Sequence, residues 1–169
     1  MLLRNFTVFF ALLGLAACQS TKKATVALAE PNAVIEMAKG GDTSAQHRLC
    51  YDYSYGARDL PEDAGKAVFW CTKGAEAGVL SSVTLLAEKH LYGLGVPENK
   101  SLAYTLYAQA ANAGHRHAQY IAARILLEGE AVEPDLDQAI IWLEASASQG
   151  YAPARELLEF LANEPEYRT

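Results

Sequence analysis

Three cysteines and four histidines are the residues of this sequence most suited to nucleophilic or metal chemistry. No histidine or asparagine stands in a recognisable motif that would activate Cys50 or Cys71 as a thiolate. His115 and His117 lie two positions apart, so a helix would project them to nearly opposite sides, away from a shared metal ion. No His-Glu-x-x-His or Cys-x-x-Cys spacing occurs. The sequence therefore predicts no catalytic residue, no metal site, no cofactor and no enzymatic activity.

Cys18 has a different context. A positive start at Arg4 precedes a nearly uniform apolar run over residues 6–17, which ends in Leu15-Ala16-Ala17-Cys18. Such a run is typical of a signal peptide, and it is too short to cross a bilayer core of about 30 Å. The ending resembles the bacterial lipobox, in which the cysteine sulfur receives a diacylglycerol and the leader is removed. We expect residues 1–17 to be a lipoprotein signal peptide and Cys18 to be lipidated; an ordinary secretory leader is the alternative.

Gln19 follows the predicted lipid site. In the enterobacterial sorting rule an aspartate at this position retains a lipoprotein in the inner membrane, so Gln19 favours the outer membrane. Residues 18–30 are expected to form a tether that spans at most about 40 Å when extended. The predicted location is the cell envelope, with a lipid anchor in the outer membrane and the body facing the periplasm.

The rest of the chain has the composition of one globular domain. Of its 169 residues, 51% are hydrophobic and 20% are charged, and the net charge is −6. Removal of the leader takes away Arg4 and no acid, which makes the body slightly more acidic. An acidic body without a basic cluster argues against nucleic acid as a partner. No small-molecule substrate is expected either.

An internal repeat organises this domain. Four glycines recur at a spacing of 36 or 37 residues: Gly41, Gly78, Gly114 and Gly150. A second glycine follows the first three after fifteen residues: Gly56, Gly93 and Gly129. A large apolar side chain precedes the last three by eight residues: Trp70, Leu106 and Trp142. A period of this length predicts stacked supersecondary units.

One period is interpreted as two helices. The first begins just after the repeat glycine and ends at the second glycine, which takes the left-handed conformation that terminates helices. An Asp or Asn then caps the second helix: Asp63, Asn99 and Asp135. We expect one domain over residues 31–169 with eight helices and no strand. Its parts are a leading helix around 31–39, pairs near 41–77, 78–113 and 114–149, and a partial copy over 150–163.

The second copy carries the clearest motif: Leu86-Ala87, Gly93-Leu94-Gly95-Val96, Asn99, Ala103, Leu106-Tyr107, Ala110-Ala111 and Gly114. These residues resemble the Sel-one-like repeat family, which is related to tetratricopeptide repeats. The resemblance implies an all-α fold, an α/α solenoid of about three and a half to four helix pairs in a right-handed superhelix. The first copy departs from the pattern, because it has an extra residue and Arg58 replaces the second loop glycine.

In the fold that the resemblance implies, Cys50 and Cys71 occupy positions that pack against each other between paired helices. The equivalent pairs in the other copies join a small residue to a large one: Ala87 with Tyr107, and Ala123 with Leu143. Once Cys18 carries lipid, two cysteines remain, and the periplasm is oxidising. We therefore expect a disulfide between Cys50 and Cys71; two buried free thiols are the alternative.

The resemblance also implies that the first helix of each pair lines the concave side of the solenoid. Its outward residues define a predicted partner-binding set, called the groove row below: His47, Tyr51, Tyr55, Thr84, Glu88, Tyr92, His117, Tyr120, Arg124 and Glu128. Rigid aromatic side chains mixed with hydrogen-bonding groups are typical of binding surfaces. The alternative is that some of these tyrosines pack against the neighbouring helix.

The resulting functional prediction is a membrane-anchored scaffold that binds a partner protein or peptide in its concave groove. One alternative is an envelope enzyme or peptidoglycan-associated protein, since some cysteine-rich relatives are linked to penicillin binding or β-lactam hydrolysis. Another is a structural component of an envelope assembly.

Overall fold

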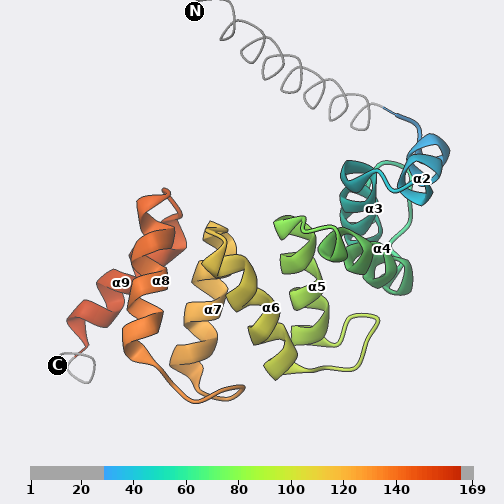
Figure 1. Ribbon diagram of the computed structural model, residues 1–169. Helices are drawn as coiled ribbons and strands as arrows, with labels where there is room; N and C mark the ends of the chain where they lie inside the picture. Colours follow the sequence, from blue (N-terminus) through green and yellow to red (C-terminus); the bar gives the residue numbers. More distant parts are fainter. Residues whose placement is uncertain (1–28, 165–169) are drawn as a thin grey trace, which may run out of the picture.

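The computed structural model describes residues 29–164, which form a row of packed helices (Figure 1). Eight helices and no strand occur in this range, as the repeat predicts: α2 (Pro31–Lys39), α3 (Thr43–Tyr55), α4 (Ala64–Glu76), α5 (Leu80–Tyr92), α6 (Lys100–Asn112), α7 (Arg116–Glu128), α8 (Leu136–Ser148) and α9 (Ala152–Asn163). Each helix packs on its sequence neighbour, with the closest association in the pairs α3–α4, α5–α6 and α7–α8. The fold is an all-α, α/α solenoid, as predicted.

The predicted helix ends are confirmed. Gly56, Gly93 and Gly129 end α3, α5 and α7 with φ of 63°, 66° and 67°, in the left-handed region that glycine adopts without a steric cost. The second helix of each pair begins at a side-chain cap that accepts a hydrogen bond from a backbone N–H 2.9 Å away: Asp63, Asn99 and Asp135. Local sequence therefore marks where α3, α5 and α7 stop and where α4, α6 and α8 start.

The core lies between the two helices of each pair and between neighbouring pairs. The positions equivalent to Cys50 and Cys71 are buried in every full copy: Ala87, Tyr107, Ala123 and Leu143. The buried apolar residues form one cluster over α2–α5 and a second over α5–α9. Because each pair covers the apolar face of the next, stability depends on stacking rather than on any one helix.

The face of α9 that corresponds to this pair interface is polar. Glu159 occupies the repeat position of Cys50, Ala87 and Ala123, and it is exposed where those three are fully buried. Burial of an unpaired carboxylate is costly, so this residue disfavours packing of an apolar helix there. Arg155 is exposed where its counterpart Val83 is buried, which extends the same polar surface.

The loop after α3 shows how the first copy accommodates Arg58 in place of the second loop glycine. Arg58 and Asp59 both have positive φ, 52° and 65°, at the point where the second copy uses Gly95. This conformation is unfavourable for side chains other than glycine, so the surrounding contacts must hold it. The Arg58 guanidinium forms an ion pair with the buried carboxylate of Asp52, which anchors the loop to α3.

Candidate functional site

The groove row lies on α3, α5 and α7, the first helices of the three pairs. Three of its tyrosines are exposed: Tyr51 (44% exposed), Tyr55 (48%) and Tyr92 (60%). Arg124 and Glu128 are also exposed, whereas His47, Glu88, His117 and Tyr120 are partly buried. Phe160 continues the row on α9 with 55% of its surface exposed. Large aromatic side chains are therefore presented to solvent along one face of the stack.

Thr84 does not belong to this surface, and its predicted outward position is wrong. The side chain is only 6% exposed. Its hydroxyl donates a hydrogen bond to the Ser81 carbonyl oxygen 2.9 Å away, within its own helix. With so little exposed surface, this short side chain offers a partner almost no contact area.

Tyr120 was expected to be exposed, but it is partly buried against the next repeat. Its ring centroid lies 5.4 Å from that of Tyr151, at the start of α9. The Tyr151 hydroxyl lies 3.0 Å from Nδ1 of His117, and burial lowers the pKa of His117. These three side chains connect α7 to α9. Tyr120 thus follows the alternative prediction, in which some tyrosines of the row pack against a neighbouring helix.

The first half of the row is held by contacts between repeats. Tyr51 and Tyr55 are one helical turn apart, with ring centroids separated by 4.9 Å. The Tyr55 hydroxyl donates to the Glu88 carboxylate on α5 at 3.3 Å. Partial burial, together with this neighbouring carboxylate, raises the pKa of Tyr55 to about 12. The phenol therefore stays protonated at neutral pH and its ring has a defined orientation.

The second half of the row contains two adjoining hollows. The larger, of about 340 Å³, lies between α5 and α7, and a hollow of about 240 Å³ lies between α7 and α9. The first is lined by Leu91, Tyr92, Glu98, Lys100, Ile121, Arg124, Ile125, Glu128, Glu130 and Ala131. The second shares Arg124 and Glu128 and adds Phe160. Arg124 Nη2 contacts Glu128 Oε1 at 2.8 Å, so one ion pair separates the two hollows.

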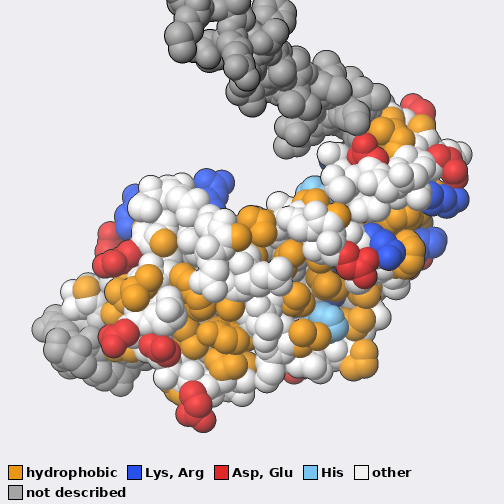
Figure 2. Space-filling model, viewed as in Figure 1, with side chains coloured by type: hydrophobic (Ala, Val, Ile, Leu, Met, Phe, Trp, Pro, Cys, Tyr) orange, Lys and Arg blue, Asp and Glu red, His pale blue; other side chains and the backbone are white. Residues whose placement is uncertain are grey.

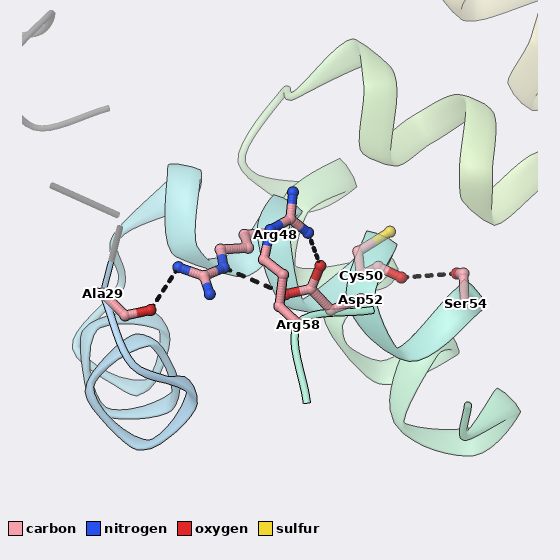
Figure 3. Close-up of polar contacts among 6 residues, drawn as sticks. All are labelled: Ala29, Arg48, Cys50, Asp52, Ser54 and Arg58. Atoms are coloured by element: carbon pink, nitrogen blue, oxygen red, sulfur yellow. Dashed lines mark hydrogen bonds and ion pairs between the residues drawn. The ribbon is translucent and has the colours of Figure 1, made fainter. Parts of the chain in front are cut away.

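A buried charge cluster at α3 was not predicted from the sequence. The Asp52 carboxylate is fully buried and pairs with Arg48 Nε at 3.2 Å and with Arg58 (Figure 3). Arg48 also donates through Nη1 to the Ala29 carbonyl oxygen, 2.9 Å away. The corresponding residues in the later copies are Lys89 and Ile125. A comparison of the repeats could therefore have shown that an acid is unusual at this position. The cluster joins the segment before α2 to α3 and has a structural role.

The predicted disulfide between Cys50 and Cys71 is present and joins α3 to α4. Both cysteines are fully buried, and their Cα atoms are 4.6 Å apart. Neither sulfur is available as a nucleophile or a metal ligand in this state. Cys18, the predicted lipid site, lies outside the described residues.

The remaining candidates for site chemistry have structural surroundings. Nδ1 of His115 accepts the N–H of Ala118 at 3.3 Å and so caps α7. Among residues 29–164, no group of three or more His, Cys, Asp or Glu side chains could hold a metal ion. The Ser-x-x-Lys spacing of penicillin-binding enzymes occurs once in the sequence, at Ser20 and Lys23, and lies outside the described residues.

The face drawn in Figure 2 has no large cluster of basic side chains. Hydrophobic and uncharged groups occupy its middle, and the charged side chains of both signs gather toward its two ends. A membrane-spanning segment would need a long apolar helix, and none of the described helices meets that requirement.

Two solved structures share this fold. A Sel1 repeat protein from Oxalobacter formigenes matches 73% of this chain and 93% of its own, with a TM-score of 0.67 and 28% identity. The protein c5321, described as a protective antigen of uropathogenic Escherichia coli strains displaying an SLR fold, matches 78% of this chain and 28% of its own. Its TM-score is 0.73, at 26% identity.

Curated relatives cover part of the chain. The Sel1-repeat-containing protein YjcO of Escherichia coli strain K12 is 33% identical over 113 residues, which are 65% of this chain and 45% of that protein. This chain thus corresponds to about half the length of its curated relatives. The Sel1 repeat family model matches residues 43–79, 82–115 and 116–151, more than half of the chain. The chain therefore belongs to the Sel1 repeat family, whose members are generally non-catalytic scaffolds for protein–protein interactions.

Proposed function

We propose that this chain is a membrane-anchored scaffold that holds a partner protein or extended peptide along its groove row. The observation that carries the proposal is the series of exposed aromatic side chains, Tyr51, Tyr55, Tyr92 and Phe160, along the first helices of successive pairs. Apart from the hydrogen bond from Tyr55 to Glu88, packing of the repeats leaves much of the surface of these rings uncovered. Such rings contribute large apolar contacts with few rotatable bonds when a partner covers them.

The hollows of the second half support a partner of this kind. Tyr92 lines the one between α5 and α7, and Phe160 lines the one between α7 and α9. Hollows of this size suit individual side chains of a polypeptide and are shallower than the enclosed sites that small-molecule ligands occupy. The proposed partner therefore places successive side chains into neighbouring hollows.

The proposed anchor is a lipid on Cys18 in the outer membrane, with the body in the periplasm. The lipobox, Gln19 and the short tether support this part of the proposal. Because residues 18–30 reach at most about 40 Å, the groove works close to the membrane surface. A partner that is itself membrane-bound or attached to the cell wall would be within reach.

We expect Tyr51→Ala and Tyr92→Ala each to weaken partner binding by about 2 kcal/mol, roughly thirtyfold, without lowering the melting temperature. Both rings are exposed, so truncation removes few contacts within the protein. A photo-activated cross-linking side chain at position 51 or 92 in intact cells identifies the partner. Its affinity for the purified variants is then measured.

Phe69→Ala is the matched control, because Phe69 is an equally large aromatic residue, 54% exposed, on α4 rather than on a first helix. It should leave both affinity and melting temperature unchanged. Tyr120→Ala should differ from both, because its ring packs on Tyr151 and its loss lowers stability. If Phe69→Ala reduces binding as strongly as Tyr92→Ala, the partner does not use the groove row and the proposal is wrong.

A further inference from the structure

The two cations that line the hollow between α5 and α7 each pair with a carboxylate of the protein. Lys100 Nζ contacts Glu130 Oε2 at 2.7 Å, and Arg124 contacts Glu128 at 2.8 Å. In the first half of the row, Arg58 lies below Tyr51 and shares the single Asp52 carboxylate with Arg48. Both basic side chains that line the hollow between α5 and α7 therefore already have a carboxylate partner, which weakens their attraction for an acidic ligand.

Several carboxylates near the groove row, in contrast, have no ion-pair partner within residues 29–164. Glu88, Glu98 and Glu156 form no ion pair with any residue of the described range 29–164. Glu88 accepts the neutral Tyr55 hydroxyl, and Glu98 lines the hollow between α5 and α7. The pKa of Lys100 is raised, first by its hydrogen bond to Glu130, with smaller contributions from Glu98 and Glu128. The residues that line the hollow between α5 and α7 thus carry more negative than positive charge.

The tyrosine rings of the groove row differ in whether a cation of the protein lies over them. Tyr51 has the Arg58 guanidinium 5.7 Å from its ring centroid, Tyr55 has Lys89 at 5.6 Å, and Tyr120 has Arg124 at 5.9 Å. Tyr92 is the most exposed tyrosine of the row, and no lysine or arginine within residues 29–164 stacks on its ring. An exposed tyrosine face attracts a cation electrostatically.

Tyr92 and Glu98 line the same hollow. Leu91, Ile121 and Ile125 line it too, so a side chain entering it meets apolar groups as well as the ring and the carboxylate. Lysine and arginine match this arrangement, because their aliphatic stems pack on apolar surface while the charged end reaches a carboxylate or a ring face.

We propose that the hollow between α5 and α7 is a subsite for a lysine or arginine side chain of the bound polypeptide, held by Tyr92 and Glu98. The subsite rests on the proposed function, because it specifies which residue of the partner the groove row selects. Partners of this protein accordingly present a basic residue in an extended or exposed segment, and acidic segments are rejected by the surplus carboxylates.

The test is a display selection of random dodecapeptides on the full chain in detergent micelles, followed by affinity measurements on the selected peptides. We expect a shared lysine or arginine whose replacement by glutamine weakens binding. Glu98→Gln should weaken binding about threefold to fivefold, and Tyr92→Leu about tenfold, because the latter loses the ring contact as well. Glu144→Gln, the same change at an exposed position on α8 outside the hollow, should have no effect.

Salt separates charge pairing from general packing. Between about 0.15 M and about 0.5 M NaCl the screening length falls to about 4 Å, so the difference between the wild type and Glu98→Gln should largely disappear. Selected peptides that depend on Tyr51 and Tyr92 but contain no basic residue would overturn the subsite and leave the groove function intact. Basic peptides that bind Glu98→Gln as tightly as the wild type overturn the subsite too. Selection of peptides indifferent to both tyrosines contradicts the groove function itself.

Discussion

Loss of the Cys50–Cys71 disulfide should lower the free energy of unfolding by about 3 kcal/mol and the melting temperature by about 10 °C. The bond closes a loop with a sequence separation of 21 residues, and it restricts the unfolded chain by an amount that depends on this length. It also joins α3 to α4 in the first pair, whose loop is held in an unfavourable backbone conformation. The first repeat therefore depends on the bond more than its sequence pattern suggests.

The design of the variant follows from the sister repeats. Cys50→Ala with Cys71→Leu reproduces the Ala123 and Leu143 combination that fills the same buried positions in the third copy. It removes the covalent link while keeping a large residue against a small one, so that a cavity contributes little to the result. Thermal unfolding of the wild type and of this variant is measured with and without reductant.

The wild type should lose stability in reductant, and the variant should be insensitive to it. If reduction leaves the wild-type melting temperature unchanged although thiol labelling confirms two free cysteines, then packing around the sulfurs stabilises the pair and the link adds nothing. If the variant has the same melting temperature as the oxidised wild type, the covalent link likewise adds nothing to stability.

Much of the fold could be predicted because its determinants are local and repeated. Glycines such as Gly93 mark helix ends through their backbone conformation, and caps such as Asn99 mark helix starts through one side-chain hydrogen bond. Three copies of the same signals at a constant spacing remove the ambiguity that a single copy would have. The facing cysteines were predictable for the same reason, since the later copies show what those positions contain.

The surface was less predictable, because exposure depends on the neighbouring repeat rather than on helix periodicity alone. Thr84 and Tyr120 lie at equivalent positions of successive copies, yet the short side chain is buried under its neighbours and the long one packs on Tyr151. The charge balance depends on partners distant in sequence. Lys100 and Glu130 come from different repeats, and their pairing leaves Glu98 as the surplus carboxylate of the hollow.

Substitution of Cys18 by alanine should abolish lipidation of the protein and its anchoring in the outer membrane. The lipobox reaction needs the thiol, so no acyl chain can be attached, and the precursor should stay uncleaved between Ala17 and residue 18. Each buried methylene contributes about 0.8 kcal/mol, and stable anchoring takes more than one chain, so a lipidated cysteine should place nearly all of the protein in the membrane fraction. Mass spectrometry of the purified wild type should find an acylated cysteine at its amino terminus.

The control must separate lipidation from folding, because a misfolded chain can also leave the membrane fraction or be degraded. Cys50→Ala with Cys71→Leu serves here too, since it changes two cysteines of the folded body and leaves the lipobox intact; it should remain in the membrane. Gln19→Asp is expected to move the lipidated protein from the outer to the inner membrane without releasing it. A wild-type protein whose amino terminus lies elsewhere and carries no lipid would overturn the anchor. The groove row would then belong to a protein that is free to diffuse, and its reach would no longer be limited by residues 18–30.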